Sequence, residues 1–240
     1  LIIILIFEKA SWSQQYSISL QIPDAADSTI YLAHHFNGQV FVDDTVHLDL
    51  QGKGKFEGDS LLDQGMYLIY LNKDRFNDFL LGPDQKLRIK HSFIDPEKFE
   101  ITGSTDSELF NSYKLFLKDL KTRQQELFNK RKEFQENADS LKIINAELDQ
   151  LNEKVTRFWF SEAKKYPGSL YSSFLLSNYI PPLNKEEIPD KWQKNDSLRW
   201  VYEYNFRKDH YWDYLDVSDE RFLRTPGLKP RLENYFDNVL

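Results

Sequence analysis

The first half of the chain alternates between apolar and polar residues over short stretches, a pattern typical of β-strands. Asn37-Gly38 suits a two-residue hairpin turn, because both residues tolerate a positive φ. Short strands separated by turn-forming residues predict an antiparallel β-sandwich over residues 14–104. The predicted strands are residues 16–22, 29–33, 40–42, 46–50, 66–71, 79–81, 87–90 and 99–101.

The apolar pattern changes to a helical one after Gly103. Thr105 and Glu108 are spaced as a capping box, and apolar residues then recur every three or four positions as far as Phe134. A break is expected at residues 138–140, followed by a second stripe with a heptad rhythm. That stripe either packs within the chain, which we favour, or meets a partner helix. It consists of Leu141, Ile144, Leu148, Leu151, Val155 and Phe158.

Shorter helical patterns follow the two long ones. Ser169 is placed to cap a helix over residues 170–179, and residues 198–206 and 231–240 also have helical spacing. The predicted fold class is therefore α+β, with an N-terminal antiparallel β-sandwich followed by an all-helical domain. That domain covers residues 105–240 and begins with a long antiparallel helical hairpin.

Residues 1–13 resemble the end of a secretory signal peptide. Leu1 to Phe7 form an apolar run too short to span a bilayer, and Ser11 and Ser13 lie at the small-residue positions of a cleavage site before Gln14. The alternative is a buried first strand. No cysteine follows the run, so we expect no lipoprotein anchor. We expect an exported protein of the periplasm or cell envelope, without membrane insertion once the signal is removed.

Composition narrows the classes of function. The net charge is −7 and neither half of the chain is basic, so we expect no nucleic-acid partner. Aromatic residues make up 15% of the chain, which favours bulky core packing over a ligand-binding surface. The 240 residues contain no cysteine, which excludes disulfides, thiolate metal sites and cysteine nucleophiles from this sequence.

Two short motifs in the β-region suggest chemistry but are better explained by structure. Residues 52–55, Gly-Lys-Gly-Lys, lack the spacing of a phosphate-binding loop, and Phe56 follows where Ser or Thr would be needed. We interpret them as a hairpin turn. Adjacent histidines on a strand point to opposite faces, so His34 and His35 are not expected to share a metal ion. His47 and His91 are isolated from them in other predicted strands.

Residues 205–226 are dense in aromatic, acidic and arginine residues. Four potential ligands or acid/base groups recur there every three residues: His210, Asp213, Asp216 and Asp219. A cation site or an acid/base hydrolase is the less favoured interpretation.

Local structural roles explain more of this segment. Ser218 can cap a helix whose first turn holds Asp219 and Glu220, and Thr225-Pro226 can begin another helix. Arg221 and Arg224 can pair with nearby carboxylates. We predict no catalytic, cofactor-binding or metal-binding residue, and no cofactor.

Several of these stretches resemble the N-terminal region of secreted TlpA-like thioredoxin-family thiol–disulfide oxidoreductases of Gram-negative bacteria. In that family a β-domain and a helical domain, both of unknown function, precede the thioredoxin domain. Gly54 departs from the pattern, because it stands where the family has a Phe. The similar stretches are Asp27-Ser28 with residues 30–32, Asp44-Thr45, residues 54–58, 65–69 and 101–104, and residues 210–213 through 218–226.

The resemblance implies envelope thiol–disulfide exchange by the intact protein, but the thioredoxin domain and its CxxC motif are absent from this sequence. We therefore expect a non-catalytic region that binds or positions a protein partner. The alternative is a stand-alone envelope module that binds sugar or peptide through exposed aromatic residues. The oligomeric state is left open.

Overall fold

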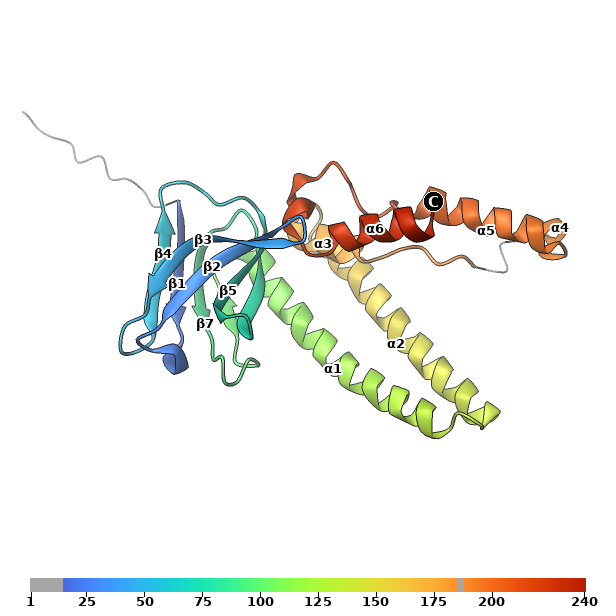
Figure 1. Cartoon of the computed structure of the whole chain (residues 1–240), viewed down its shortest axis with the longest axis horizontal. Coiled ribbons are helices and arrows are strands. Elements are labelled where there is room, and N and C mark those ends of the chain that lie inside the picture. The colour runs from blue at the N-terminus through green and yellow to red at the C-terminus, as the bar shows by residue number, and fades with distance from the viewer. Residues whose placement is uncertain (1–14, 185–187) are drawn as a thin grey trace, which may run out of the picture.

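A computed structural model describes residues 15–184 and 188–240, and it confirms the α+β fold class (Figure 1). A β-sandwich lies at one end of the molecule and the helices extend from it. The predicted signal-peptide remnant, residues 1–13, lies outside the described residues. None of the described helices is long and apolar enough to cross a membrane.

Two four-stranded sheets form the sandwich. Sheet A has the order β4-β1-β7-β8 and sheet B the order β3-β2-β5-β6. Neighbouring strands are antiparallel except β1 and β7, which pair in parallel. The strands are β1 (Tyr16–Gln21), β2 (Thr29–Phe36), β3 (Gln39–His47), β4 (Lys53–Gly58), β5 (Gly65–Asn72), β6 (Arg75–Leu81), β7 (Lys86–Lys90) and β8 (Glu100–Thr102), and a 3-10 turn, η1 (Pro23–Ala25), follows β1.

Two strand predictions require correction. The stretches 40–42 and 46–50 were expected as separate strands, but most of them belongs to the single strand β3. Leu32 faces Asp44 and Ala33 faces Val42, so Asp43 is the extra residue of a β-bulge that interrupts the apolar alternation. Strand β4 was not predicted, because Phe56 is its only fully buried side chain and its other residues are lysine, glycine and glutamate.

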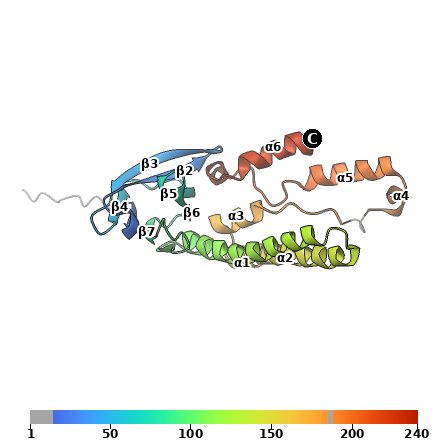
Figure 2. The same cartoon turned by 60° about the horizontal axis from the view of Figure 1, so that its bottom comes forward.

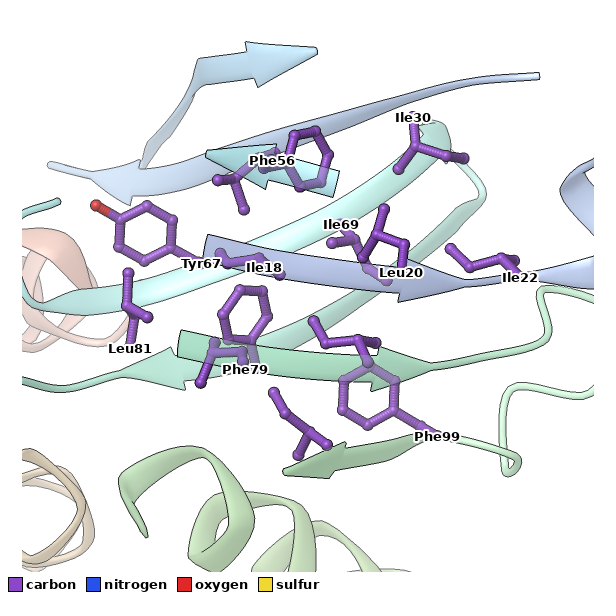
Figure 3. Close-up of a cluster of buried hydrophobic side chains, with 14 of the residues drawn as sticks. Ile18, Leu20, Ile22, Ile30, Phe56, Tyr67, Ile69, Phe79, Leu81 and Phe99 are labelled. Carbon is purple, nitrogen blue, oxygen red and sulfur yellow. The ribbon is translucent and has the colours of Figure 1, made fainter. Parts of the chain in front are cut away.

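The interior of the sandwich is an apolar cluster supplied by both sheets. Figure 3 shows side chains of β1 and β5, among them Ile18 and Ile69, pointing toward one another between the sheets. Both residues are fully buried, as are Phe56 and Phe79. The burial follows from the alternation in β1, whose even-numbered residues face inward.

The predicted hairpin turn at Asn37-Gly38 is confirmed. Phe36 pairs with Gln39, and the two turn residues have φ values of 48° and 76°. The turn at Gly52 differs from the prediction, because β3 and β4 lie in different sheets. Residues 48–52 therefore carry the chain from one sheet to the other instead of closing a hairpin.

The helical hairpin is also confirmed. It pairs α1 (Thr105–Glu133) with α2 (Ala138–Lys165), and the break lies at residues 134–137, earlier than expected. Asn137 caps α2 by accepting a bond from the Ser140 amide. We call this hairpin the arm. The remaining helices are α3 (Leu170–Ser177), α4 (Asp190–Gln193), α5 (Asp196–His210), the 3-10 turn η3 (Glu220–Arg224) and α6 (Leu228–Asn238).

Several predicted helix caps shift by one or two residues. Ser104, not Thr105, is the N-cap of α1, and Glu108 accepts a hydrogen bond from the Gly103 amide. Ser169 does cap α3, by accepting from the Ser172 amide.

The caps predicted in residues 218–226 are also displaced. Asp219, not Ser218, caps η3 by accepting from the Arg221 amide. Thr225 ends η3 instead of starting α6, and its hydroxyl donates to the Phe222 carbonyl. Because α6 begins only at Leu228, Pro226 is not its first residue.

A second apolar core attaches the helices to the sandwich. It is formed where α1 and α3 pack on sheet B, at the side opposite the sandwich interior. Met66 of β5 and Leu80 of β6 meet aromatic and aliphatic side chains from both helices. The helix residues in this core are Phe110, Tyr113, Leu170, Tyr171 and Leu175.

Asp106 lies within this second core and contacts the first turns of two helices. It is in the first turn of α1, and its carboxylate accepts a 2.7 Å bond from the Tyr171 amide in the first turn of α3. The helix dipoles favour a negative charge at both positions, but burial outweighs them and raises the pKa of this carboxyl. A Cβ at Gly82 would collide with this carboxylate, so the end of β6 needs glycine for the close approach.

Two glycines with similar backbone angles allow a matched test of the turn between the sheets. Gly52 and Gly168 have φ values of 74° and 75°. A Cβ at Gly52 would collide with the Ile22 backbone, whereas one at Gly168 would meet no atom within 4 Å. Gly168→Ala should lower the free energy of unfolding by about 1 kcal/mol, the cost of a left-handed residue. Gly52→Ala should lower the free energy of unfolding at least twice as much, as measured by urea titration. Equal losses would contradict the tight packing at Gly52.

Candidate partner-binding surface

The four histidines of the β-region do not form one site. His34 Nδ1 lies 2.7 Å from Asp43 Oδ2, and His35 Nε2 lies 3.0 Å from Asp78 Oδ1. The pairing of the adjacent histidines with different carboxylates agrees with their expected opposite directions. His47 contacts Asp27, and His91 packs between the rings of Phe93 and Phe99. Among the residues that the structure describes, no three His, Asp or Glu side chains are grouped as a metal site.

The turn at residues 49–53 is closed by its own hydrogen bonds. The Asp49 carboxylate accepts bonds of 2.9 and 2.8 Å from the amides of Gln51 and Lys53. A phosphate-binding loop would direct such amides toward a ligand. Here an internal carboxylate already occupies them, so the turn has a structural role.

The acidic residues of 210–219 likewise make separate local contacts. His210 pairs with Asp213 at 2.8 Å, Asp216 accepts from Ser218, and Asp219 forms a double contact with Arg221. The last two interactions lower the pKa of each aspartate. Such groups are ordinary surface and capping carboxylates. The geometry does not gather these four residues around a shared cation.

The following residues, 220–225, connect the helices to the sandwich. The Asn37 amide donates to the Leu223 carbonyl at 2.8 Å, and Phe222 is buried. Arg224 pairs with Asp63 and lies over the Phe36 ring, 5.4 Å from its centroid. The sequence predicts that Arg221 and Arg224 pair with carboxylates nearby in the chain. Arg221 does so, but the partner of Arg224 lies 161 residues away, in the sandwich.

Arg231 was not singled out from the sequence, although it holds several helical segments together. Its guanidinium donates to the carbonyls of Ser177 and Tyr211, and it lies 5.0 Å from the centroid of the Tyr211 ring. Burial lowers the pKa of this guanidinium. The helical spacing of 231–240 was visible, but its carbonyl partners come from distant segments.

An open apolar groove runs along the arm, with a volume of about 590 Å³. Its lining residues all belong to α1 and α2, and lysines supply all of its charged groups. The heptad stripe of α2 packs within the chain, as we favoured. Ile144 is its only buried residue, because two helices cover each other along one side alone. The groove is lined by Lys114, Leu117, Lys118, Leu120, Lys121, Gln124, Leu151, Asn152 and Val155.

A second exposed surface lies on α5, which has no buried residue. Trp200 is 61% exposed and stacks on Tyr204, with ring centroids 5.4 Å apart. Figure 2 shows α4 and α5 at the end of the molecule far from the sandwich. Aromatic rings exposed in this way suit binding of a flat or apolar ligand surface.

The base of the arm contains a half-buried lysine. Lys114 Nζ donates to Asn77 Oδ1 at 2.6 Å and to the Asp78 carbonyl at 2.9 Å, and it lies 4.3 Å from the centroid of the Phe99 ring. Burial lowers its pKa to about 8. The ammonium therefore ties α1 to β6 at the cost of its own desolvation.

The chain matches no protein-family model, and no curated protein is significantly similar to it. The resemblance to TlpA-like proteins therefore rests on the quoted motifs alone and stays a hypothesis.

Lys114 should give the protein a measurable pH dependence. Between pH 8 and the ordinary lysine pKa of about 10.4, the unfolded chain binds more protons at this position than the folded protein does. Stability relative to Lys114→Met should therefore rise with pH, by up to about 3 kcal/mol. Subtracting the free energy of unfolding of Lys114→Met from that of the wild type cancels the contributions of the other titrating groups.

Urea unfolding from pH 7 to 10.5 measures this difference. Leu115→Ala changes an exposed, non-titrating neighbour, so its difference from the wild type should stay constant with pH. A constant difference for Lys114→Met as well would show that this lysine is not desolvated.

Proposed function

We propose that the chain is the non-catalytic, partner-binding region of an exported thioredoxin-like thiol–disulfide exchange protein. Its reactive cysteines would lie outside this sequence, in a domain where a thiolate attacks a disulfide. Three features support the proposal: the motifs that resemble the TlpA-like family, the cysteine-free sequence, and the arm.

The groove on the arm is the observation that carries partner binding. Leu117, Leu151 and Val155 are only half-buried in it, and only residues of the arm itself line it. Burial of such apolar surface against another protein would be favourable at about 25 cal/mol per Å² removed from water, before the costs of association. The arm would position a partner near a redox domain, while the sandwich supports the base of the arm.

The coding sequence beyond Leu240 is the first test. We expect a strand–helix unit with a WCxxC motif in the same reading frame. A stop codon shortly after Leu240 would refute the thioredoxin part of the proposal and leave partner binding to be tested separately.

The second test examines the arm in the intact protein. With the resolving cysteine replaced by serine, partners should accumulate as mixed disulfides. Leu117→Glu should lower their yield about tenfold, equivalent to about 1.4 kcal/mol, because it places a charge in the apolar groove.

Leu115→Glu is the matched control, since it makes the same change on the same helix at a residue that does not line the groove. Without the serine replacement, reduction of a small aromatic disulfide should be unchanged in both variants. Equal trapping by the two glutamate variants would exclude the groove as the binding surface.

The exposed rings of α5 favour a second candidate function, a stand-alone envelope module that binds sugar or peptide. On this alternative, wild-type protein should bind members of a glycan or peptide array, and Trp200→Ala should weaken that binding several-fold. Leu198→Ala, an exposed change on the same helix, is the control. Binding that survives the loss of Trp200 would count against this alternative.

A further inference from the structure

Strand β3 is an edge strand of sheet B and exposes three consecutive apolar residues. Val40, Phe41 and Val42 are 48%, 44% and 52% exposed. They lie in the half of the β2–β3 hairpin that extends toward the helices (Figure 1). Side chains on both faces of β3 are therefore exposed in this half of the hairpin. Near Val46, in contrast, β3 packs against the sandwich core.

The backbone of the same residues is also available for pairing. Phe36 and Gln39 close the two-residue turn as a hydrogen-bonded pair, so the alternation of an antiparallel ladder makes His34 and Phe41 the next such pair. The amides and carbonyls of Val40 and Val42 then point away from β2. Within residues 15–184 and 188–240, no backbone hydrogen bond to another element uses these groups.

Natural proteins protect exposed edges with lysine, proline or a bulge. Residues 39–42 contain neither lysine nor proline, and the bulge at Asp43 only limits the length of the free edge. An apolar edge of this kind is a template for pairing with another strand.

We propose that the strand it accepts is β3 of a second copy of this chain, antiparallel about a two-fold axis through Phe41. In this register Val40 of each copy lies opposite Val42 of the other, and the outward backbone groups of both residues form four hydrogen bonds. Gln39 lies opposite Asp43 of the second copy.

Charge favours the antiparallel orientation. A parallel in-register pairing would place Asp43 opposite Asp43, and like charges directly opposite are destabilising. The antiparallel arrangement separates the aspartates of the two copies and keeps apolar residues opposite apolar ones. The inference does not depend on the proposed function, because it concerns the sandwich and not the arm.

Residues 1–240 contain no cysteine, so a single introduced cysteine gives a direct test in this chain. At a two-fold axis Phe41 faces its own copy in a non-hydrogen-bonded pair, where Cα atoms lie about 4.5 Å apart. That spacing falls within the range of about 4.4–6.8 Å that a disulfide requires. Phe41→Cys should therefore give a disulfide-linked dimer under mild oxidation, at least tenfold faster than Leu50→Cys, whose residue is 76% exposed but outside β3.

Sedimentation velocity over a concentration series tests the unmodified protein, so the result does not depend on removing Phe41. Wild type should show a monomer–dimer equilibrium, and Val42→Lys should shift it to monomer. Thr45→Lys adds the same charge to β3 beyond the bulge and should leave the equilibrium unchanged; circular dichroism verifies folding of both variants. Monomer at every concentration, equal cross-linking of the two cysteine variants, or a dimer insensitive to Val42→Lys would each overturn the proposal.

Discussion

Attachment of the helices to the outer face of sheet B determines how the rest of the molecule is arranged. A two-sheet sandwich can leave that face in water, but here Met66 and Leu80 are buried beneath α1 and α3. Strands β5 and β6 therefore lie between two apolar cores, which explains why residues 66–71 are almost continuously apolar instead of alternating. Loss of this second core would detach the arm from the sandwich.

Buried polar contacts give that attachment its direction. Apolar packing is non-directional, whereas a hydrogen bond requires particular atoms at a particular angle. Asp106 fixes the starts of α1 and α3 relative to each other, and Lys114 ties α1 to β6. Arg231 of α6 donates to a carbonyl of α3 and to a carbonyl of the turn after α5, so it holds these three segments together. Hydrogen bonds offset only part of the cost of burying these charges, because burial still shifts the pKa of all three groups toward the neutral form. The same bonds require particular atoms, so they specify one arrangement of the helices.

The arrangement leaves two apolar surfaces open, the groove on the arm and the edge of β3. They differ in chemistry: the groove offers side chains between two helices and suits a packed partner, while the edge offers backbone groups and suits a strand. The dense segment 205–226, which at first suggests an active site, instead connects the helices to the sandwich through Leu223 and Arg224. A fold of this kind does not by itself indicate a function.

The sequence by itself determined most element types, the hairpin turn at Asn37-Gly38 and the separation of His34 from His35, because each depends on local period or turn chemistry. Only the tertiary structure decided the parallel pairing of β1 with β7, the strand β4, and the partner of Arg224. These depend on contacts between residues far apart in the chain, which no local pattern encodes. The groove on the arm is also a result of the tertiary structure. The heptad stripe predicted that α2 packs against another helix. Its exposed part depends on the number of helices that cover it, which the stripe does not encode.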